Sequence, residues 1–126
     1  MNKVLRSLRY ACFGLKFCFE TQRNMIIHAV IGAAILILGA VLRVSLTGML
    51  FLLSAVMIVL VAEAFNTALE KTIDIYTKER NHLAQTAKDV AAGAVLLTTI
   101  FAVLVGLVVL GPPLWRLLAG NLFGYF

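Results

Sequence analysis

The sequence predicts an all-α membrane protein with one N-terminal amphipathic helix at the interface and three transmembrane helices. Its 126 residues are 62% hydrophobic and 13% charged, and the mean hydropathy of +0.99 is far outside the range of a soluble domain. Three windows without Lys, Arg, Asp or Glu, at 24–42, 44–62 and 90–115, are long enough to cross hydrocarbon, which takes roughly 20 residues. Because their apolar residues are continuous rather than alternating, helices are favoured over barrel strands.

The first expected element is an amphipathic helix over residues 1–23. Its apolar side carries Val4, Leu5, Leu8, Ala11, Cys12, Leu15 and Phe19, and its polar side carries Arg6, Arg9, Lys16 and Glu20. Charges spread along the whole segment are typical of a helix lying in the membrane interface and not of a signal peptide. Two roles stay open for it, a simple anchor or one wall of a site.

Three longer helices, expected at 25–42, 47–75 and 83–110, contain the spans. The tight connection 43–48 offers Ser and Thr as helix caps, and the polar connection 76–82 is short. Gly111-Pro112-Pro113 is expected to end the third helix, because proline lacks the N–H that a helix interior needs. We expect one domain over 1–126, and residues 111–126 receive no functional assignment.

The distribution of basic residues predicts the orientation of these spans in the membrane. Most precede the first span or surround the second connection, namely Lys3, Arg6, Arg9, Lys16, Arg23, Lys71, Lys78, Arg80 and Lys88. Only Arg43 and Arg116 fall on the other side. By the positive-inside rule the N-terminus is cytoplasmic and the C-terminus lies outside a plasma membrane. The net charge of +5 needs no nucleic acid, because inward-facing Lys and Arg near anionic headgroups account for it.

One acidic stripe closes the second span. Glu63, Asn66, Glu70 and Asp74 are separated by steps of 3, 4 and 4 residues, so they lie within about 80° of one another on a helix. Ionisable groups at this depth are costly and usually serve a function. Glu70 with Glu63 suits a hard divalent ion such as Mg²⁺, and the deeper Glu63 suits a general base.

Lys88 and Asp89 open the third helix beside the same short connection and are expected to supply the opposite wall. Lys88 could neutralise phosphate charge, so the group suits phosphoryl transfer to an alcohol at the membrane surface. The small residues of 91–94 that follow are expected to pack closely against another helix.

Structural alternatives stay open for the stripe. Glu70 could be merely solvated, and Asp74 could pair only with Lys71 or Lys78. Asn66 could form a hydrogen bond between helices, which contributes roughly 0.6 kcal/mol to their association. His28 is interpreted as a packing residue. Two other classes of protein are considered as well, an acid-lined ion- or proton-conducting oligomer and a purely structural oligomer. A conducting oligomer would need polar residues in the outer half of the spans, which hold few. In a purely structural oligomer, the free-energy cost of an ionisable Glu63 in the membrane would serve no function.

The residues E-A-F-N-T-A-L-E-K-T-I-D at 63–74 and A-K-D-V-A-A-G-A-V at 87–95 closely resemble the signature of the prokaryotic diacylglycerol kinase family, which includes undecaprenol kinases. The similarity covers about residues 3–110. It implies a homotrimer with sites between neighbouring subunits at the cytoplasmic interface. It also implies ATP- and Mg²⁺-dependent phosphorylation of a lipid hydroxyl, either diacylglycerol to phosphatidic acid or undecaprenol to undecaprenyl phosphate.

Residue roles follow from the resemblance, position by position. Glu63 resembles the general base and Glu70 a metal-binding carboxylate beside the ATP. Residues matching other parts of the nucleotide and catalytic site are Asn66, Asp74, Lys88 and Asp89, together with Lys3 and Tyr10 of the amphipathic helix and Glu79 of the connection.

One position departs from the family pattern. Where the family usually has Glu before Arg-Asn, this chain reads Thr21-Gln22-Arg23-Asn24. Gln22 is expected on the apolar stripe of the first helix, where its carbonyl oxygen can still ligate a metal but brings no charge. The sequence therefore predicts weaker Mg²⁺ binding than in relatives with Glu there, and a poor kinase or altered chemistry is the more extreme alternative.

Overall fold

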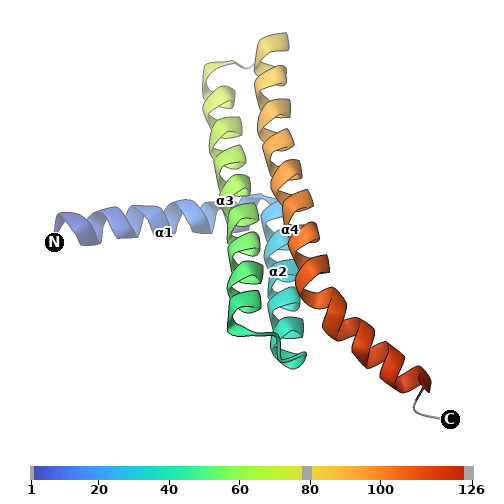
Figure 1. The fold of residues 1–126 in the computed structure, drawn as a ribbon. Coiled ribbons are helices and arrows are strands. Elements are labelled where there is room, and N and C mark those ends of the chain that lie inside the picture. Colours follow the sequence, from blue (N-terminus) through green and yellow to red (C-terminus); the bar gives the residue numbers. More distant parts are fainter. Residues whose placement is uncertain (1, 78–80, 124–126) are drawn as a thin grey trace.

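The described part of the chain is entirely helical. The computed structural model describes residues 2–77 and 81–123, with side chains as far as Ala119, and these form α1 (Lys3–Thr21), α2 (Arg23–Val41), α3 (Leu46–Tyr76) and α4 (His82–Phe123). Helices α2, α3 and α4 lie side by side, while α1 projects sideways from them (Figure 1). The three packed helices are long and apolar enough to cross a membrane. The predicted architecture of a multi-pass, all-helical protein is confirmed.

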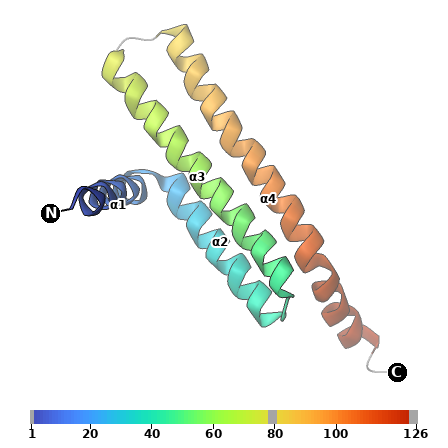
Figure 2. The same cartoon turned by 60° about the vertical axis from the view of Figure 1, so that its left-hand side comes forward.

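Helix α1 keeps its apolar face free of protein. Val4, Leu5 and Leu8 are between 58% and 72% exposed, and both views show the N-terminal part of the helix standing away from the bundle (Figures 1 and 2). Such an uncovered apolar stripe is what an interfacial helix presents to lipid. The helix ends at Thr21, and Gln22 has extended backbone angles, φ −111° and ψ 110°, so it joins α1 to α2 instead of continuing the stripe as predicted.

Helices α2 and α3 approach closely at glycines. A Cβ built on Gly32 would lie 2.5 Å from Val56 Cγ1, and one on Gly39 would lie 3.0 Å from Leu52 Cδ1. Small residues permit such close packing between helices in lipid. Within one chain the close packing predicted for the 91–94 run is not found at Gly93, because a Cβ there would meet nothing within 4 Å. Helix α4 buries Val95 instead, and two positions along a helix correspond to about 200° of rotation.

The connection from α2 to α3 is a short capped turn. The N–H of Arg43 donates to Ala40 O at 3.1 Å and that of Val44 to Gly39 O at 3.0 Å, which is a Schellman ending. Arg43 takes the position that usually belongs to glycine, with φ 53°. Ser45 then caps α3, its Oγ accepting from Gly48 N–H at 3.2 Å, as its residue type predicts.

The predicted end of the third span at Gly111-Pro112-Pro113 is wrong. Helix α4 continues through both prolines to Phe123, and its C-terminal part is inclined to the rest (Figure 1). A proline removes one helical hydrogen bond and bends a helix, but unwinding in lipid would leave many more backbone groups without partners. A bent helix is the less costly solution, and the side chains of residues 115–118 beyond the prolines are exposed.

The length of α3 sets where its polar end lies. Its 31 residues span roughly 46 Å at 1.5 Å per residue, more than the roughly 30 Å of hydrocarbon. The paired ends of α3 and α4 extend well past the level at which α1 joins the bundle (Figures 1 and 2). With α1 in the membrane interface, as its sequence predicts, this end of the α3–α4 pair would project toward water.

Candidate functional site

The acidic stripe of α3 runs from the protein interior to solvent. Glu63 is 2% exposed and Asn66 is 8% exposed, Glu70 is half-buried, and Asp74 is exposed. The four side chains share one helix face, as their spacing predicts. The stripe therefore offers a graded environment, dry at Glu63 and wet at Asp74, along a single rigid helix.

Two residues that the pattern did not assign to the site surround Glu63. Thr67 is 2% exposed, and its hydroxyl donates to the Glu63 carbonyl at 2.9 Å. His28 of α2 lies near enough for an electrostatic interaction with the Glu63 carboxylate. Thr67 follows Glu63 by four residues, so helical spacing could have found it; His28 comes from another helix, so no local pattern could.

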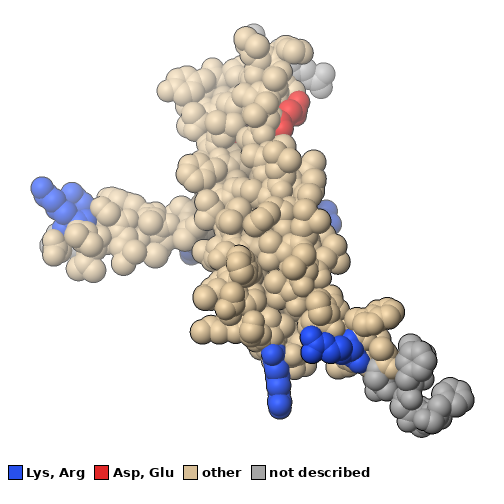
Figure 3. Space-filling view, in the orientation of Figure 1, with Lys and Arg blue, Asp and Glu red and all other residues tan. Residues whose placement is uncertain are grey.

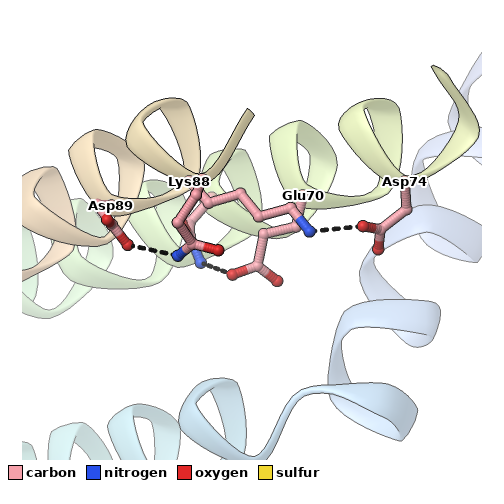
Figure 4. Close-up of polar contacts among 6 residues, drawn as sticks. Glu70, Asp74, Lys88 and Asp89 are labelled. Atoms are coloured by element: carbon pink, nitrogen blue, oxygen red, sulfur yellow. Dashed lines mark hydrogen bonds and ion pairs between the residues drawn. The ribbon is translucent and has the colours of Figure 1, made fainter. Parts of the chain in front are cut away.

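Asn66 donates a hydrogen bond to the Glu70 carboxylate, and its own side-chain oxygen is unpaired among the described residues. Its Nδ2 donates to Glu70 Oε1 at 3.2 Å (Figure 4). Its Oδ1 is buried and has no hydrogen-bond partner. A buried acceptor left unpaired costs about 1–3 kcal/mol, so this oxygen is placed to receive a donor or a cation. Asn66 is thus more than a contact between helices.

An ion pair joins α3 to α4 at the exposed end of the stripe. Lys88 donates to Asp74 Oδ1 across the two helices (Figure 4). This contact places Lys88 of α4 opposite the stripe, as expected, and contradicts the alternative that Asp74 pairs only with Lys71 or Lys78, of which Lys78 lies outside the described residues. Lys71 instead places its Nζ 6.0 Å from the centre of the Phe17 ring on α1.

Asp89 lies on the same wall but is held by α4 itself. Gln85 Nε2 donates to Asp89 Oδ1 at 2.8 Å (Figure 4). Gln85 was not singled out from the sequence, although it precedes Asp89 by four residues and such pairs meet on a helix surface. The exposed Asp89 carboxylate is therefore oriented, with its second oxygen left for other contacts.

The donor set suits a hard divalent cation only in part. The Glu70 carboxylate and Asn66 Oδ1 are oxygen ligands of the kind Mg²⁺ takes, and that ion usually completes its shell with water and substrate phosphates. No three His, Cys, Asp or Glu side chains within 2–77 and 81–123 are grouped closely enough to hold a metal. These residues fit Mg²⁺ as two ligands among several.

Three of the predicted site residues that the structure describes do not join this group within one chain. Lys3 begins α1 at the end that points away from the bundle, and Tyr10 is exposed along the same helix (Figure 1). Gln22 lies at the α1–α2 junction and makes no hydrogen bond to Glu70 among the described residues. Glu79 lies outside the described residues.

Comparisons with known proteins agree with this geometry. The profile of the prokaryotic diacylglycerol kinase family matches residues 9–110. A diacylglycerol kinase of Synechocystis sp. is 41% identical over 116 residues, which cover 91% of this chain and 66% of that protein. An undecaprenol kinase of Bacillus subtilis is 35% identical over 116 residues, covering 90% and 93%, and a diacylglycerol kinase of Escherichia coli is 29% identical over 109 residues, covering 82% and 84%. The stripe of α3 and its partner wall on α4 both fall inside the matched segment, and the chain belongs to the prokaryotic diacylglycerol kinase family.

Proposed function

We propose that this lipid kinase transfers the γ-phosphoryl group of ATP to the hydroxyl of diacylglycerol, producing phosphatidic acid. The observation that carries the proposal is the burial gradient along α3, from Glu63 at 2% exposure to the exposed Asp74. A lipid hydroxyl arrives from the membrane and a nucleotide from water. The gradient orders the two reactants along one helix face, with the base candidate on the lipid side.

Each residue of the stripe has one task in this scheme. Glu63 accepts the proton of the attacking hydroxyl, a role that suits a carboxylate held in a dry, rigid place. Asn66 and Glu70 would hold Mg²⁺, which supplies charge neutralisation on the phosphates. Lys88 adds a second positive charge there, and Asp74 positions its ammonium group. Asp89, fixed by Gln85, completes the nucleotide-facing end.

Residues distant from the stripe within one chain would join it in a homotrimer. We place Lys3 and Tyr10 against the nucleotide of a neighbouring subunit, with Glu79 beside it and Gln22 as a neutral oxygen ligand of the metal. Two observations support this arrangement. Among the described residues the metal ligands within one chain are incomplete, and α1 reaches away from its own bundle (Figure 2). The basic residues favour a cytoplasmic site in the plasma membrane.

Undecaprenol is the second candidate acceptor. The Bacillus subtilis undecaprenol kinase is matched over 93% of its length, whereas the chain spans 66% of the Synechocystis diacylglycerol kinase, which has the higher identity of 41%. The conducting-oligomer alternative gains no support. A groove of about 470 Å³ between α2, α3 and α4 is lined almost entirely by apolar side chains, with His28 and Thr99 the exceptions.

The test is phosphoryl transfer from labelled ATP in mixed micelles that contain Mg²⁺ and either diacylglycerol or undecaprenol. We expect transfer to diacylglycerol with a kcat/KM that is higher by about tenfold or more, the size of difference a lipid-specific site gives. Glu63→Gln should remove the transfer. The matched control is Glu20→Gln, because Glu20 is an exposed acid of α1 paired with Lys16 at 3.5 Å. No transfer to either lipid would reject the kinase proposal, and preference for undecaprenol would replace the acceptor.

A further inference from the structure

A second polar pocket lies at the end of the bundle opposite the acidic stripe. It encloses about 420 Å³ between the α2–α3 turn and the proline-containing part of α4, and two arginines, Arg43 and Arg116, line it. Basic side chains gather at this end of the molecule in the space-filling view, and the acidic side chains in that view lie at the other end (Figure 3).

Two features of the fold bring these arginines to one place. The Schellman turn sets Arg43 at the tip of the α2–α3 connection. The continuation of α4 through Pro112 and Pro113 carries Arg116 to the same pocket. Gly48 allows the helices to close, because a Cβ there would lie 2.6 Å from Val44 Cγ1 and 3.1 Å from Val109 Cγ1. A helix ending at Gly111 would leave Arg43 alone.

Among the described residues, neither arginine forms an ion pair with a carboxylate. The sequence has no Asp or Glu at 21–62 or at 90–126, and the ion pairs of the described residues join Lys16 to Glu20 and Lys88 to Asp74. The C-terminal end of α2 and the N-terminus of α3 both lie at this pocket, so their opposite helix dipoles offset each other. The positive charge of the pocket therefore comes from the two guanidinium groups.

We infer that this pocket binds the phosphate group of an anionic phospholipid. Two guanidinium groups match phosphate oxygens in charge and geometry. A lipid is favoured over a free anion because Val44, Val109 and the two prolines give the pocket apolar walls at the end of three membrane spans. The inference goes beyond the proposed kinase activity, and Arg116 lies outside the segment that the family profile matches.

The experiment measures thermal unfolding of the full-length protein in a neutral detergent, titrated with phosphatidylglycerol or phosphatidylcholine. The unfolding temperature should rise with phosphatidylglycerol and much less with phosphatidylcholine. Arg43→Gln with Arg116→Gln should raise the apparent phosphatidylglycerol Kd about tenfold or more. Equal effects of the two lipids on the native protein would overturn the inference. So would a double variant that keeps the native Kd.

A relocation variant separates a built site from general surface charge. Arg116→Gln combined with Leu117→Arg keeps the net charge and the depth in the membrane but turns the guanidinium about 100° around α4; Leu117 is 54% exposed, so it accepts the larger side chain. We expect this variant to bind phosphatidylglycerol as weakly as Arg116→Gln alone. Binding equal to that of the native protein would mean that any arginine at this depth suffices, and the pocket would lose its role.

Two further arms test the source of the phosphate and the integrity of the fold. Inorganic phosphate, titrated in place of lipid, should not raise the unfolding temperature; protection equal to that of phosphatidylglycerol would overturn the lipid assignment. Arg43→Gly should unfold at the native temperature or above without lipid, because glycine suits φ 53°. It should nevertheless lose most of the phosphatidylglycerol effect, which a merely structural role of Arg43 would not cause.

Discussion

The two ends of the bundle differ in whether their charged side chains are paired within the protein. At one end Asn66 holds Glu70, and Lys88 bridges to Asp74, so most charges are met by the protein itself. At the other end Arg43 and Arg116 share a pocket without an acidic side chain. A preorganised set of partners favours chemistry on a bound substrate. Uncompensated charge favours capture of an ion of opposite sign. The same three helices therefore carry the proposed reaction site at one end and the inferred docking site at the other.

The largest effect is expected at the buried start of the acidic stripe. Glu63→Gln should lower kcat by about 10²–10⁴, the usual contribution of a general base, with little change in the unfolding temperature because the side-chain shape is kept. Initial rates in mixed micelles and a melting curve measure the two quantities. A Glu63→Gln protein with native kcat would mean that this end is not a reaction site.

The bridge between α3 and α4 should matter more for activity than for stability. Lys88→Met should lower kcat/KM about tenfold to a hundredfold, because a positive charge facing phosphate is lost. The free energy of unfolding should change little, since the pair is partly exposed and water screens it. Kinetics and chemical denaturation test both. Lys16→Met, which breaks an exposed pair on α1, is the control; equal losses in both variants would contradict the proposed role.

Adding a carboxylate at residue 22 should strengthen Mg²⁺ binding at the acidic end. Gln22→Glu should lower the Mg²⁺ concentration that gives half-maximal activity severalfold, because a charged oxygen ligand binds the ion more tightly than a neutral one. A Mg²⁺ titration of the native and variant proteins measures the change. An unchanged half-saturating concentration would show that residue 22 does not approach the metal in the assembled protein.

The smallest effect is expected at the arginine end. Arg43→Gly should stabilise the lipid-free protein by up to about 1 kcal/mol, because a non-glycine residue with φ above zero is strained. Its phosphoryl-transfer rate should stay native, since the stripe lies at the far end. Thermal unfolding in neutral detergent and a micelle assay check the two expectations. A lower melting temperature would show that Arg43 contributes contacts within the fold that outweigh its strain.

Much of this fold was predictable because each helix carries its own signals. Apolar windows indicated the spans, Ser45 indicated a cap, and the 3, 4, 4 spacing placed the stripe from Glu63 to Asp74 on one face. The errors arose where surroundings override local rules. Pro112 bends α4 without ending it, because unpaired backbone in lipid is costlier than a bend. A Cβ on Gly93 would meet nothing within 4 Å, so this glycine is not a close helix contact within one chain.

The candidate site was predictable to the same degree. The stripe and the Lys88 wall were found, and Thr67 and Gln85 were missed, while His28 lines an apolar groove in agreement with its interpretation as a packing residue. The roles of Gln22, Lys3, Tyr10 and Glu79, the trimer, the single domain and the membrane orientation remain predictions, because each depends on parts of the assembly beyond one chain or on the membrane itself.

The sequence by itself determined which chemical groups each helix carries and on which face, since those follow from composition and a period of 3.6 residues. Only the tertiary structure decided which faces meet. It placed Lys88 against Asp74 and brought Arg43 and Arg116 to one pocket. The physical reason is that helix pairing depends on the fit between two surfaces, such as Gly32 against Val56. The periodicity of a single helix does not specify which surface of a neighbouring helix it will contact.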